Sequence, residues 1–509
     1  MNQMKNEMKK GAILGYINIL ATLLVGLVYT PIMLKLIGQA EYGLYSLVIS
    51  ITAYLSVLDM GFGNAMVRYI SQCQAKNDGQ NEAKLNGLFL IIYSIIGIIT
   101  LIIGIIIFLN INNLFTTSLT IEELRKAKII MIVLIGTIAV SFPLSIYDSY
   151  ALASEKFVFL RTLNILKTIL VPLTMLPLLL SGFKSITMVI ITCVFNILYH
   201  VCTLLYDYKK LSMKITFSFT ASEKKLFKEI STYSFFIFLN LIVDSVFNNT
   251  DQIILGSLCG TIVVSIYSVG AKIFQMNTAI STTISGMFLP KVTKILQDDN
   301  GNKKVSNMFL KVSRIQLYIM LLILTGFIIF GKNFIILWAG KEYVDAYYII
   351  LLLIGPAIIP LTQNVCISII QAKNRHQFRS IVYIIIAILN ICISIPLARK
   401  YGGIGAAIGT TIANLIGQIL IMNIYYYKKI NIDIPSYWKN FLKFSSIPTI
   451  LCYLFYILNN KINITSWSYT IGGIIIYSLV YFIWCYIYMN EEEKKYVKAI
   501  ANKVNLIRR

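Results

Sequence analysis

Long apolar runs without any charge recur along the whole chain, and they restrict what it can fold into. Phe89–Leu109 continues for about 20 residues without a charged side chain, which is long enough for an α-helix to cross a bilayer. Hydrophobic residues make up 57% of the 509 residues and charged residues only 13%, which is too apolar for a soluble globular protein. The sequence therefore predicts an all-α polytopic membrane protein.

Charged and Pro/Gly-rich breaks divide the chain into about 14 transmembrane helices. Their predicted starts are Gly11, Tyr42, Ala83, Lys126, Phe157, Ser185, Ser231, Thr261, Met308, Tyr343, Gln377, Gly403, Tyr437 and Ser466. If both termini are cytoplasmic, inner segments hold roughly 30 basic residues and outer segments roughly 9. Because basic residues concentrate on the cytoplasmic side, we expect both termini to be cytoplasmic.

Several classes of function find no support in the residues. The eight cysteines and two histidines show no metal-ligand spacing, so no metal site or disulfide framework is expected. The net charge of +23 lies in short loops between spans, which membrane topology explains better than nucleic-acid binding. The sequence has no GxxxxGK[ST] motif and no loop of domain size, so neither ATP hydrolysis nor another enzymatic activity is expected. Gly405 and Gly409 predict close helix packing rather than a dinucleotide loop.

A weak internal repeat predicts how the helices are organised. Gly38–Ser46 aligns without gaps on Gly260–Ser268, and Ala153–Phe159 resembles Ala372–Phe378 at nearly the same offset. Together the two matches favour a six-plus-six duplication in which both halves share one orientation. The predicted parts are an N-terminal six-helix lobe at 1–208, a cytoplasmic linker at 209–228, a C-terminal six-helix lobe at 229–430, two additional helices at 431–489 and a cytoplasmic tail at 490–509.

Six stretches of the chain carry a resemblance to a known family, namely Gly38–Ser46, Leu58–Arg68, Thr250–Gly256, Ile266–Ile273, Gln371–Asn390 and Tyr401–Gly409. Together they resemble the polysaccharide-exporter branch of the multidrug/oligosaccharidyl-lipid/polysaccharide (MOP) flippase superfamily. The resemblance implies two six-helix lobes around a cavity that opens alternately to the two sides of the membrane. It also implies a flippase that moves undecaprenyl-pyrophosphate-linked oligosaccharide repeat units to the outer leaflet for O-antigen, capsule or exopolysaccharide assembly. The implied location is the bacterial cytoplasmic (inner) membrane, and the implied partners are membrane lipids, a polysaccharide polymerase and chain-length machinery.

Basic residues inside the predicted spans are candidates for binding the pyrophosphate. Lys167 and Lys272 lie about 10 and 11 residues into their helices, near the bilayer midplane. A lysine exposed to lipid there costs roughly 2.5–3.5 kcal/mol, so each should face the bundle interior, water or a partner. Arg68 and Arg161 would stand at the inner mouth of the path and Lys35 near its exit.

These basic residues also have simpler explanations. Asp244 is predicted at almost the same depth as Lys272, and an ion pair between them would neutralise both. Arg68, Arg161 and Lys35 could extend their charges to the membrane interface without any role in transport. Both explanations remain open alongside the transport path.

Acidic residues raise the question of what drives export. Asp59, Asp244 and Asp251 are candidates for coupling to a proton or sodium gradient, because an intramembrane carboxylate can exchange a cation for an ion pair. Helix packing or pairing is the alternative for each of them. No bound cofactor is expected.

Three other functions compete with repeat-unit export. A drug/cation antiporter of the same superfamily should have twelve helices and a more acidic cavity. A flippase for a lipid-linked peptidoglycan precursor would also need cations and extra helices, so it stays open. A membrane polymerase or glycosyltransferase would need a large extramembrane loop with catalytic carboxylates, and the predicted outer loops are too short for that.

Overall fold

The computed structural model describes residues 2–116, 118–217, 221–373, 375, 377–462, 465–491 and 493–494, and all their regular secondary structure is helical. The helices form two compact units, which comprise Met1–Val269 with Tyr383–Thr410 and Gly270–Val382 with Thr411–Arg509. We call them unit 1 and unit 2 and describe each by itself. The lobes predicted at 1–208 and 229–430 follow the sequence repeat rather than these contacts and stay a prediction.

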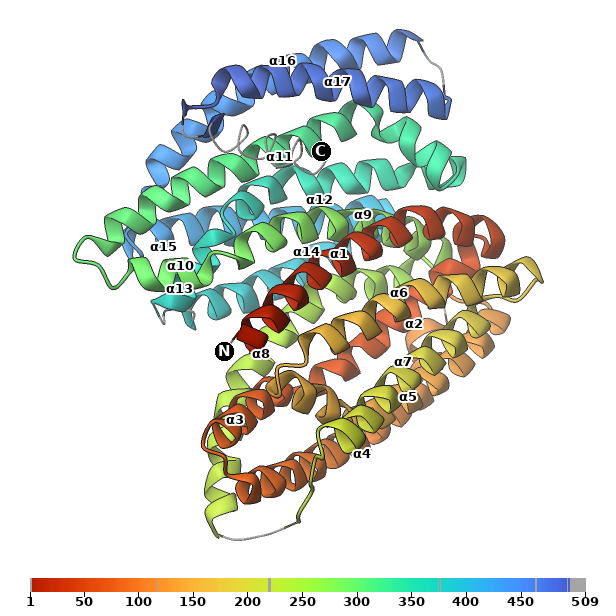
Figure 1. Cartoon of the computed structure of the whole chain (residues 1–509). Helices are drawn as coiled ribbons and strands as arrows, with labels where there is room; N and C mark the ends of the chain where they lie inside the picture. Colours follow the sequence, from red (N-terminus) through yellow and green to blue (C-terminus); the bar gives the residue numbers. More distant parts are fainter. Residues whose placement is uncertain are drawn as a thin grey trace, which may run out of the picture. The chain divides into compact units, whose positions relative to one another are not determined.

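Unit 1 is built from long helices of the N-terminal half (Figure 1). Within unit 1, α5 packs against both α4 and α7, and α1 packs along α6. The elements are α1 (Asn2–Ile37), α2 (Gln39–Ser56), η1 (Val57–Asp59), α3 (Phe62–Ala75), α4 (Gly79–Phe115), α5 (Ile121–Ala153), α6 (Phe157–Leu180), α7 (Ser185–Lys210), α8 (Ala221–Leu258), the start of α9 (Thr261–Gly286) and the middle of α14 (Gln377–Asn414).

Unit 2 is organised around α11, which packs against α12, α16 and α17. Besides the end of α9 and both ends of α14, its elements are α10 (Leu289–Ile295), α11 (Gly301–Trp338), η2 (Lys341–Tyr343), α12 (Asp345–Thr362), α13 (Val365–Ala372), η3 (Leu415–Ile421), α15 (Met422–Lys428), α16 (Ile434–Ile462) and α17 (Trp467–Tyr488).

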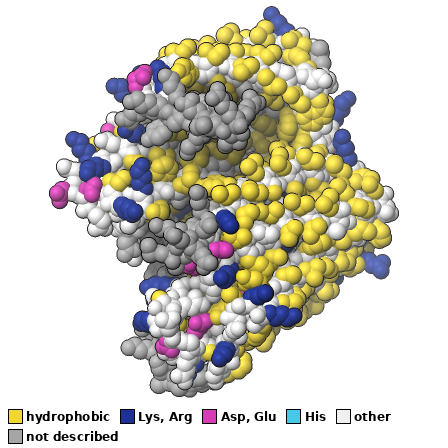
Figure 2. Space-filling model, viewed as in Figure 1, with side chains coloured by type: hydrophobic (Ala, Val, Ile, Leu, Met, Phe, Trp, Pro, Cys, Tyr) yellow, Lys and Arg dark blue, Asp and Glu magenta, His cyan; other side chains and the backbone are white. Residues whose placement is uncertain are grey.

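The predicted membrane spans correspond to helices of the structure. Among the described residues, 11 helical stretches are long and apolar enough to cross a membrane, and the long helices α8 and α9 occupy two further predicted spans. Each predicted start lies on or beside a helix. Large hydrophobic side chains such as Ile102 and Leu109 of α4 are more than half exposed, as expected for a surface in contact with lipid. Figure 2 shows hydrophobic side chains over much of the visible face, with many Lys and Arg side chains toward its margins.

The second predicted span, which starts at Tyr42, is interrupted between Asp59 and Phe62. Met60 and Gly61 have φ of 51° and 75°, so the chain leaves the helix between η1 and α3. A glycine adopts this left-handed conformation without strain. The interruption places Asp59 at the end of a helix rather than inside one.

Gly402 reverses α14 into a hairpin. Its φ of 57° and ψ of −135° are not helical, and beyond it the chain returns along the first arm. A Cβ on Gly405 would lie 2.0 Å from the carbonyl oxygen of Leu397, and one on Gly409 would lie 2.3 Å from the Ser394 hydroxyl. The predicted role of Gly405 and Gly409 in close helix packing is therefore confirmed.

The hairpin makes a prediction for stability. Gly405→Ala should lower the free energy of unfolding by about 1–3 kcal/mol, because a backbone oxygen of the opposite arm must move. Gly472→Ala in α17 is the matched control, since no atom lies within 4 Å of its added Cβ and helix propensity favours alanine. Thermal unfolding of the two variants in detergent, followed by fluorescence-detected size-exclusion chromatography, measures the difference. Equal midpoints would contradict the tight packing.

Candidate functional site

A polar cavity of about 320 Å³ lies inside unit 1. Four elements besides α3 contribute to its wall, namely η1, α5, α6 and α7. The lining residues are Asp59, Gly63, Asn64, Val67, Asp148, Ser149, Leu152, Phe157, Leu160, Arg161, Asn164 and Tyr199. Two of the predicted site residues, Asp59 and Arg161, thus share one cavity although they are far apart in the sequence.

Asp59 is held in the wall by two hydrogen bonds. Its Oδ1 accepts from the Tyr93 hydroxyl at 2.8 Å, and its Oδ2 accepts from the Gly61 backbone N–H at 3.2 Å. Tyr93 is completely buried in a core that also contains Phe62, Phe89 and Phe142. The carboxylate therefore stabilises the break between η1 and α3 while it faces the cavity.

Arg161 projects from the first turns of α6, and its side chain is exposed. Asn164 follows three residues later on the same helical face and also lines the cavity. Across the cavity, Asp148 of α5 lies 2.9 Å from Nδ1 of His200 in α7. The wall therefore offers one guanidinium, two amides and two carboxylates, a set of donors and acceptors suited to hydrogen-bonding a hydroxyl-rich group.

Lys167 lies six residues, or about 9 Å, beyond Arg161 along α6. Its Nζ donates to Oδ1 of Asn196 at 3.1 Å and lies 4.9 Å from the centre of the Tyr199 ring. Tyr199 also lines the cavity, so Lys167 lies next to the cavity wall without being part of it. The ammonium is thus stabilised by an amide and an aromatic face, and neither of these neutralises its charge.

The remaining predicted cations lie outside this cavity wall. Arg68 of α3 is exposed, with its guanidinium 5.9 Å from the ring centre of Tyr69. Lys35 is exposed in the last turn of α1. Lys272 is half-buried in the part of α9 that belongs to unit 2. Their roles in a transport path stay predictions.

The other two acidic candidates differ strongly in their surroundings. Asp251 is 2% exposed, and its Oδ2 accepts from the hydroxyls of Tyr267 and Thr410, the latter at 2.7 Å. It therefore ties α8 to α9 and α14 within unit 1. Asp244 of α8 is exposed. Its predicted ion pair with Lys272 would join the two units and stays a prediction.

Sequence reasoning missed Asp148, His200, Asn164 and Tyr199 as members of the site. Asp148 comes 27 residues after the start of α5, or roughly 40 Å, which places it at the membrane interface by depth alone. Asp148 belongs to the site because α6 and α7 place polar side chains near it. Only the polar residues spaced along α6 and α7 could have indicated a shared face before the structure was known.

Comparison with known proteins agrees with the fold and the residues. A model of the family described as polysaccharide biosynthesis protein matches residues 8–296, more than half of the chain. The capsular polysaccharide biosynthesis protein CapF of Staphylococcus aureus is 25% identical over 252 residues, which are 48% of this chain and 60% of CapF. The chain thus aligns with less than two thirds of that relative.

Two solved structures show the same fold. The lipid II flippase MurJ, in an inward closed conformation, has a TM-score of 0.73 and 18% identity, with 94% of this chain and 98% of that chain covered. A multidrug resistance MATE family transporter of the MOP superfamily, facing inward, has a TM-score of 0.60 and 14% identity, with 81% and 98% covered. These likenesses confirm the predicted all-helical, multi-pass membrane fold.

The cavity should be reachable by water-soluble reagents. We expect Asn164→Cys, in a background without the eight native cysteines, to react with a charged methanethiosulfonate. Ile102→Cys is the control, because a thiol facing lipid from α4 cannot readily form the reactive thiolate. Labelling in membrane vesicles measures both rates. Equal reactivity of the two variants would show that the cavity is closed to water.

Proposed function

We propose a function for this chain, which belongs to the polysaccharide biosynthesis protein family. It flips undecaprenyl-pyrophosphate-linked oligosaccharide repeat units across the bacterial cytoplasmic membrane. The fold is that of MOP-superfamily transporters, so the protein is a transporter rather than an enzyme. The repeat units would move from the cytoplasmic to the outer leaflet for capsule, O-antigen or exopolysaccharide assembly. Both termini would be cytoplasmic, and a polymerase with its chain-length machinery would receive the product.

The polar cavity of unit 1 is the observation that carries this proposal. A pyrophosphate and its sugars lose their hydration in hydrocarbon, and each polar group left without a hydrogen-bond partner there costs several kcal/mol. A polar cavity can replace the lost hydration. Arg161 can bind a phosphate oxygen through two N–H groups, and Lys167 adds a second positive charge one to two turns away. Asn64, Asn164 and Tyr199 offer the amides and the aromatic face that sugar hydroxyls and sugar rings need.

Alternating access supplies the movement in this proposal. The cavity would take up the head group from one leaflet and release it to the other as the helical lobes rock, while the polyprenyl chain stays in lipid. Coupling to a proton or sodium gradient through Asp59 fits its position in the cavity wall. Asp251 fits coupling less well, because hydroxyls from α9 and α14 already satisfy its carboxylate.

Arg161 gives the first test of the proposed function. Arg161→Gln should slow flipping of an undecaprenyl-pyrophosphate-linked oligosaccharide in proteoliposomes by about tenfold or more, because a hydrogen bond to a charged group contributes about 1.5–3 kcal/mol. Arg125→Gln, an exposed arginine in the first turns of α5, is the matched control. The fraction of sugar that an external lectin can reach, followed over time, measures the rate.

The same assay separates the competing transporters. Wild-type protein that moves only a lipid-linked peptidoglycan precursor, or that exchanges drugs for cations, would overturn the proposed substrate. Unchanged flipping by Arg161→Gln would remove this cavity from the path of the pyrophosphate, even if the substrate were correct.

Lys272 gives an independent test in unit 2. It lies 11 residues after Thr261, or roughly 16 Å along α9, where a lysine facing lipid would be costly. Lys272→Ala should abolish flipping while membrane insertion is kept. Lys303→Ala, an exposed lysine in the first turn of α11, should leave the rate unchanged. Wild-type rates in Lys272→Ala, measured at equal protein levels, would exclude Lys272 from the path.

A further inference from the structure

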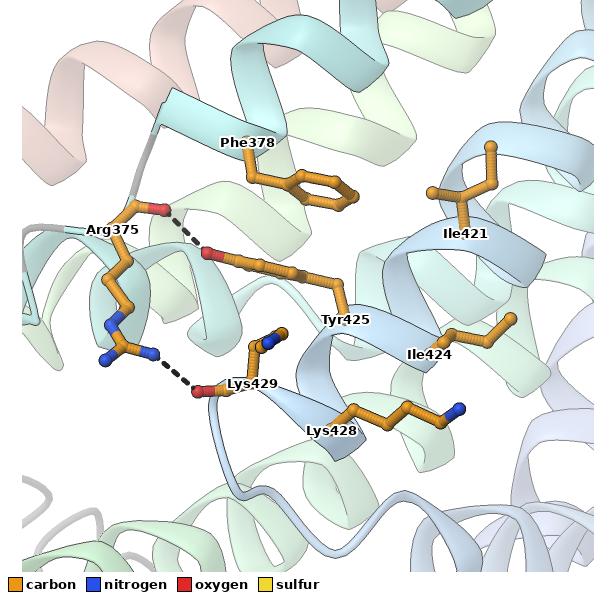
Figure 3. Close-up of a pocket in the computed structure, with 7 residues that line it drawn as sticks. All are labelled: Arg375, Phe378, Ile421, Ile424, Tyr425, Lys428 and Lys429. Atoms are coloured by element: carbon orange, nitrogen blue, oxygen red, sulfur yellow. Dashed lines mark hydrogen bonds between the residues drawn. The ribbon is translucent and has the colours of Figure 1, made fainter.

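A second cavity of about 390 Å³ lies in unit 2, and none of the residues that line it is among those proposed for transport. It is formed where α14 begins and where η3 and α15 end. The lining residues are Arg375, Phe378, Ile421, Ile424, Tyr425, Lys428 and Lys429 (Figure 3). Three of these seven side chains are basic, and none is acidic.

Both sides of this cavity belong to the same end of the α14 hairpin. Gly402 reverses the chain, so Arg375 before the first arm and Lys429 after the second arm meet at the same end of the hairpin. The pairing follows one antiparallel register, in which Ser394 contacts Ala406, Asn390 contacts Thr410 and Phe378 stacks on Tyr425. The cavity therefore sits where two apolar helices reach the membrane surface.

The upper wall of the cavity is apolar and rigid. The rings of Phe378 and Tyr425 are stacked, with centres 4.2 Å apart and planes inclined by 20°. The Tyr425 hydroxyl donates to the backbone oxygen of Arg375 at 3.0 Å, which fixes the ring (Figure 3). Ile421 and Ile424 extend this wall, and Ile424 is 56% exposed. An alkyl chain in the neighbouring lipid could continue along these two isoleucines.

The opposite edge concentrates positive charge. Nη1 of Arg375 donates to the backbone oxygen of Lys429 at 2.9 Å, which orients the guanidinium and leaves further N–H groups for a ligand. Lys428 and Lys429, at the end of α15, also line the cavity, and the Lys428 side chain extends away from Arg375 (Figure 3). The first turn of α14, which begins at Gln377, adds the positive end of a helix dipole.

A neighbouring lysine, Lys373, lies close enough to Arg375 to feel its charge. Lys373 donates to the backbone oxygen of Ile430 at 2.6 Å, so its position is fixed beside the cavity. Burial lowers the pKa of Lys373, and the charge of Arg375 lowers it further. An anion bound nearby would relieve this repulsion.

We propose that this cavity binds the phosphate head group of an anionic phospholipid, with an acyl chain against Ile421 and Ile424. The basic side chains at its edge match a phosphate, and its apolar wall matches a lipid chain. A free phosphate would gain nothing from the stacked aromatic pair. The site does not depend on the proposed transport function.

Lipid binding to the full-length protein tests this site directly. Protein in a neutral detergent is titrated with dimyristoylphosphatidylglycerol and, separately, with dimyristoylphosphatidylcholine, and native mass spectrometry counts the bound lipids. We expect the wild type to bind the anionic lipid at least fivefold more tightly. The double variant Arg375→Gln/Lys428→Gln should lose most of this preference, and Phe378→Ala should weaken binding of the anionic lipid.

Arg399→Gln/Lys400→Gln is the matched control, because both side chains are exposed at the opposite end of the same hairpin. It should keep the full preference for phosphatidylglycerol. Equal binding of the two lipids by the wild type, or equal losses in both double variants, would overturn the proposal. Competition by inorganic phosphate at the concentration of the lipid would show a simple anion site and would also overturn it. Flipping rates do not enter this test, so its failure would not affect the proposed function.

Discussion

A charge inside a hydrocarbon layer must be hydrated or paired, and this requirement organises the polar residues of the protein. In unit 1 the helices turn their large aliphatic side chains outward, as Ile102 and Leu109 of α4 do. Asp59, Asp148 and Arg161 instead gather around one cavity. The outer surface thus differs from that of a soluble protein, whereas the packed core of unit 1 is apolar in the usual way. Charged side chains that remain inside such a bundle are therefore the candidates for function.

The charged groups fall into two kinds according to how they are satisfied. Glu41 is enclosed by Lys126, whose Nζ lies 2.6 Å from its Oε1, and by the Ser185 hydroxyl. Asp251 is likewise enclosed by two hydroxyls. Such groups hold helices together, and breaking them would leave a buried charge without a partner. Arg161 differs, because it is exposed within a polar cavity and remains available to a ligand.

The helices could be predicted from the sequence because hydrophobic length and helix-breaking residues act locally. The role of Gly405 and Gly409 could be predicted for the same reason, since only a missing Cβ permits such close approach. The site could be predicted only in part. Depth along a helix identified Lys167 but said nothing of Asn196 and Tyr199, which stabilise it. Those contacts depend on how α6 is rotated and packed against α7. The position of a residue along its own helix does not predict this.

The two cavities differ in charge, and their surroundings suit different tasks. Near Arg161 the carboxylates of Asp59 and Asp148 reduce the local positive potential, so an anionic head group would bind without being trapped. A transporter needs this balance, because a ligand bound too tightly in one state is not released in the other. The cavity beside Arg375 has no acidic residue in its wall and an apolar wall next to lipid. Those features favour a lipid that stays bound over one that is transported. The second cavity would therefore anchor the protein to lipid and take no part in transport.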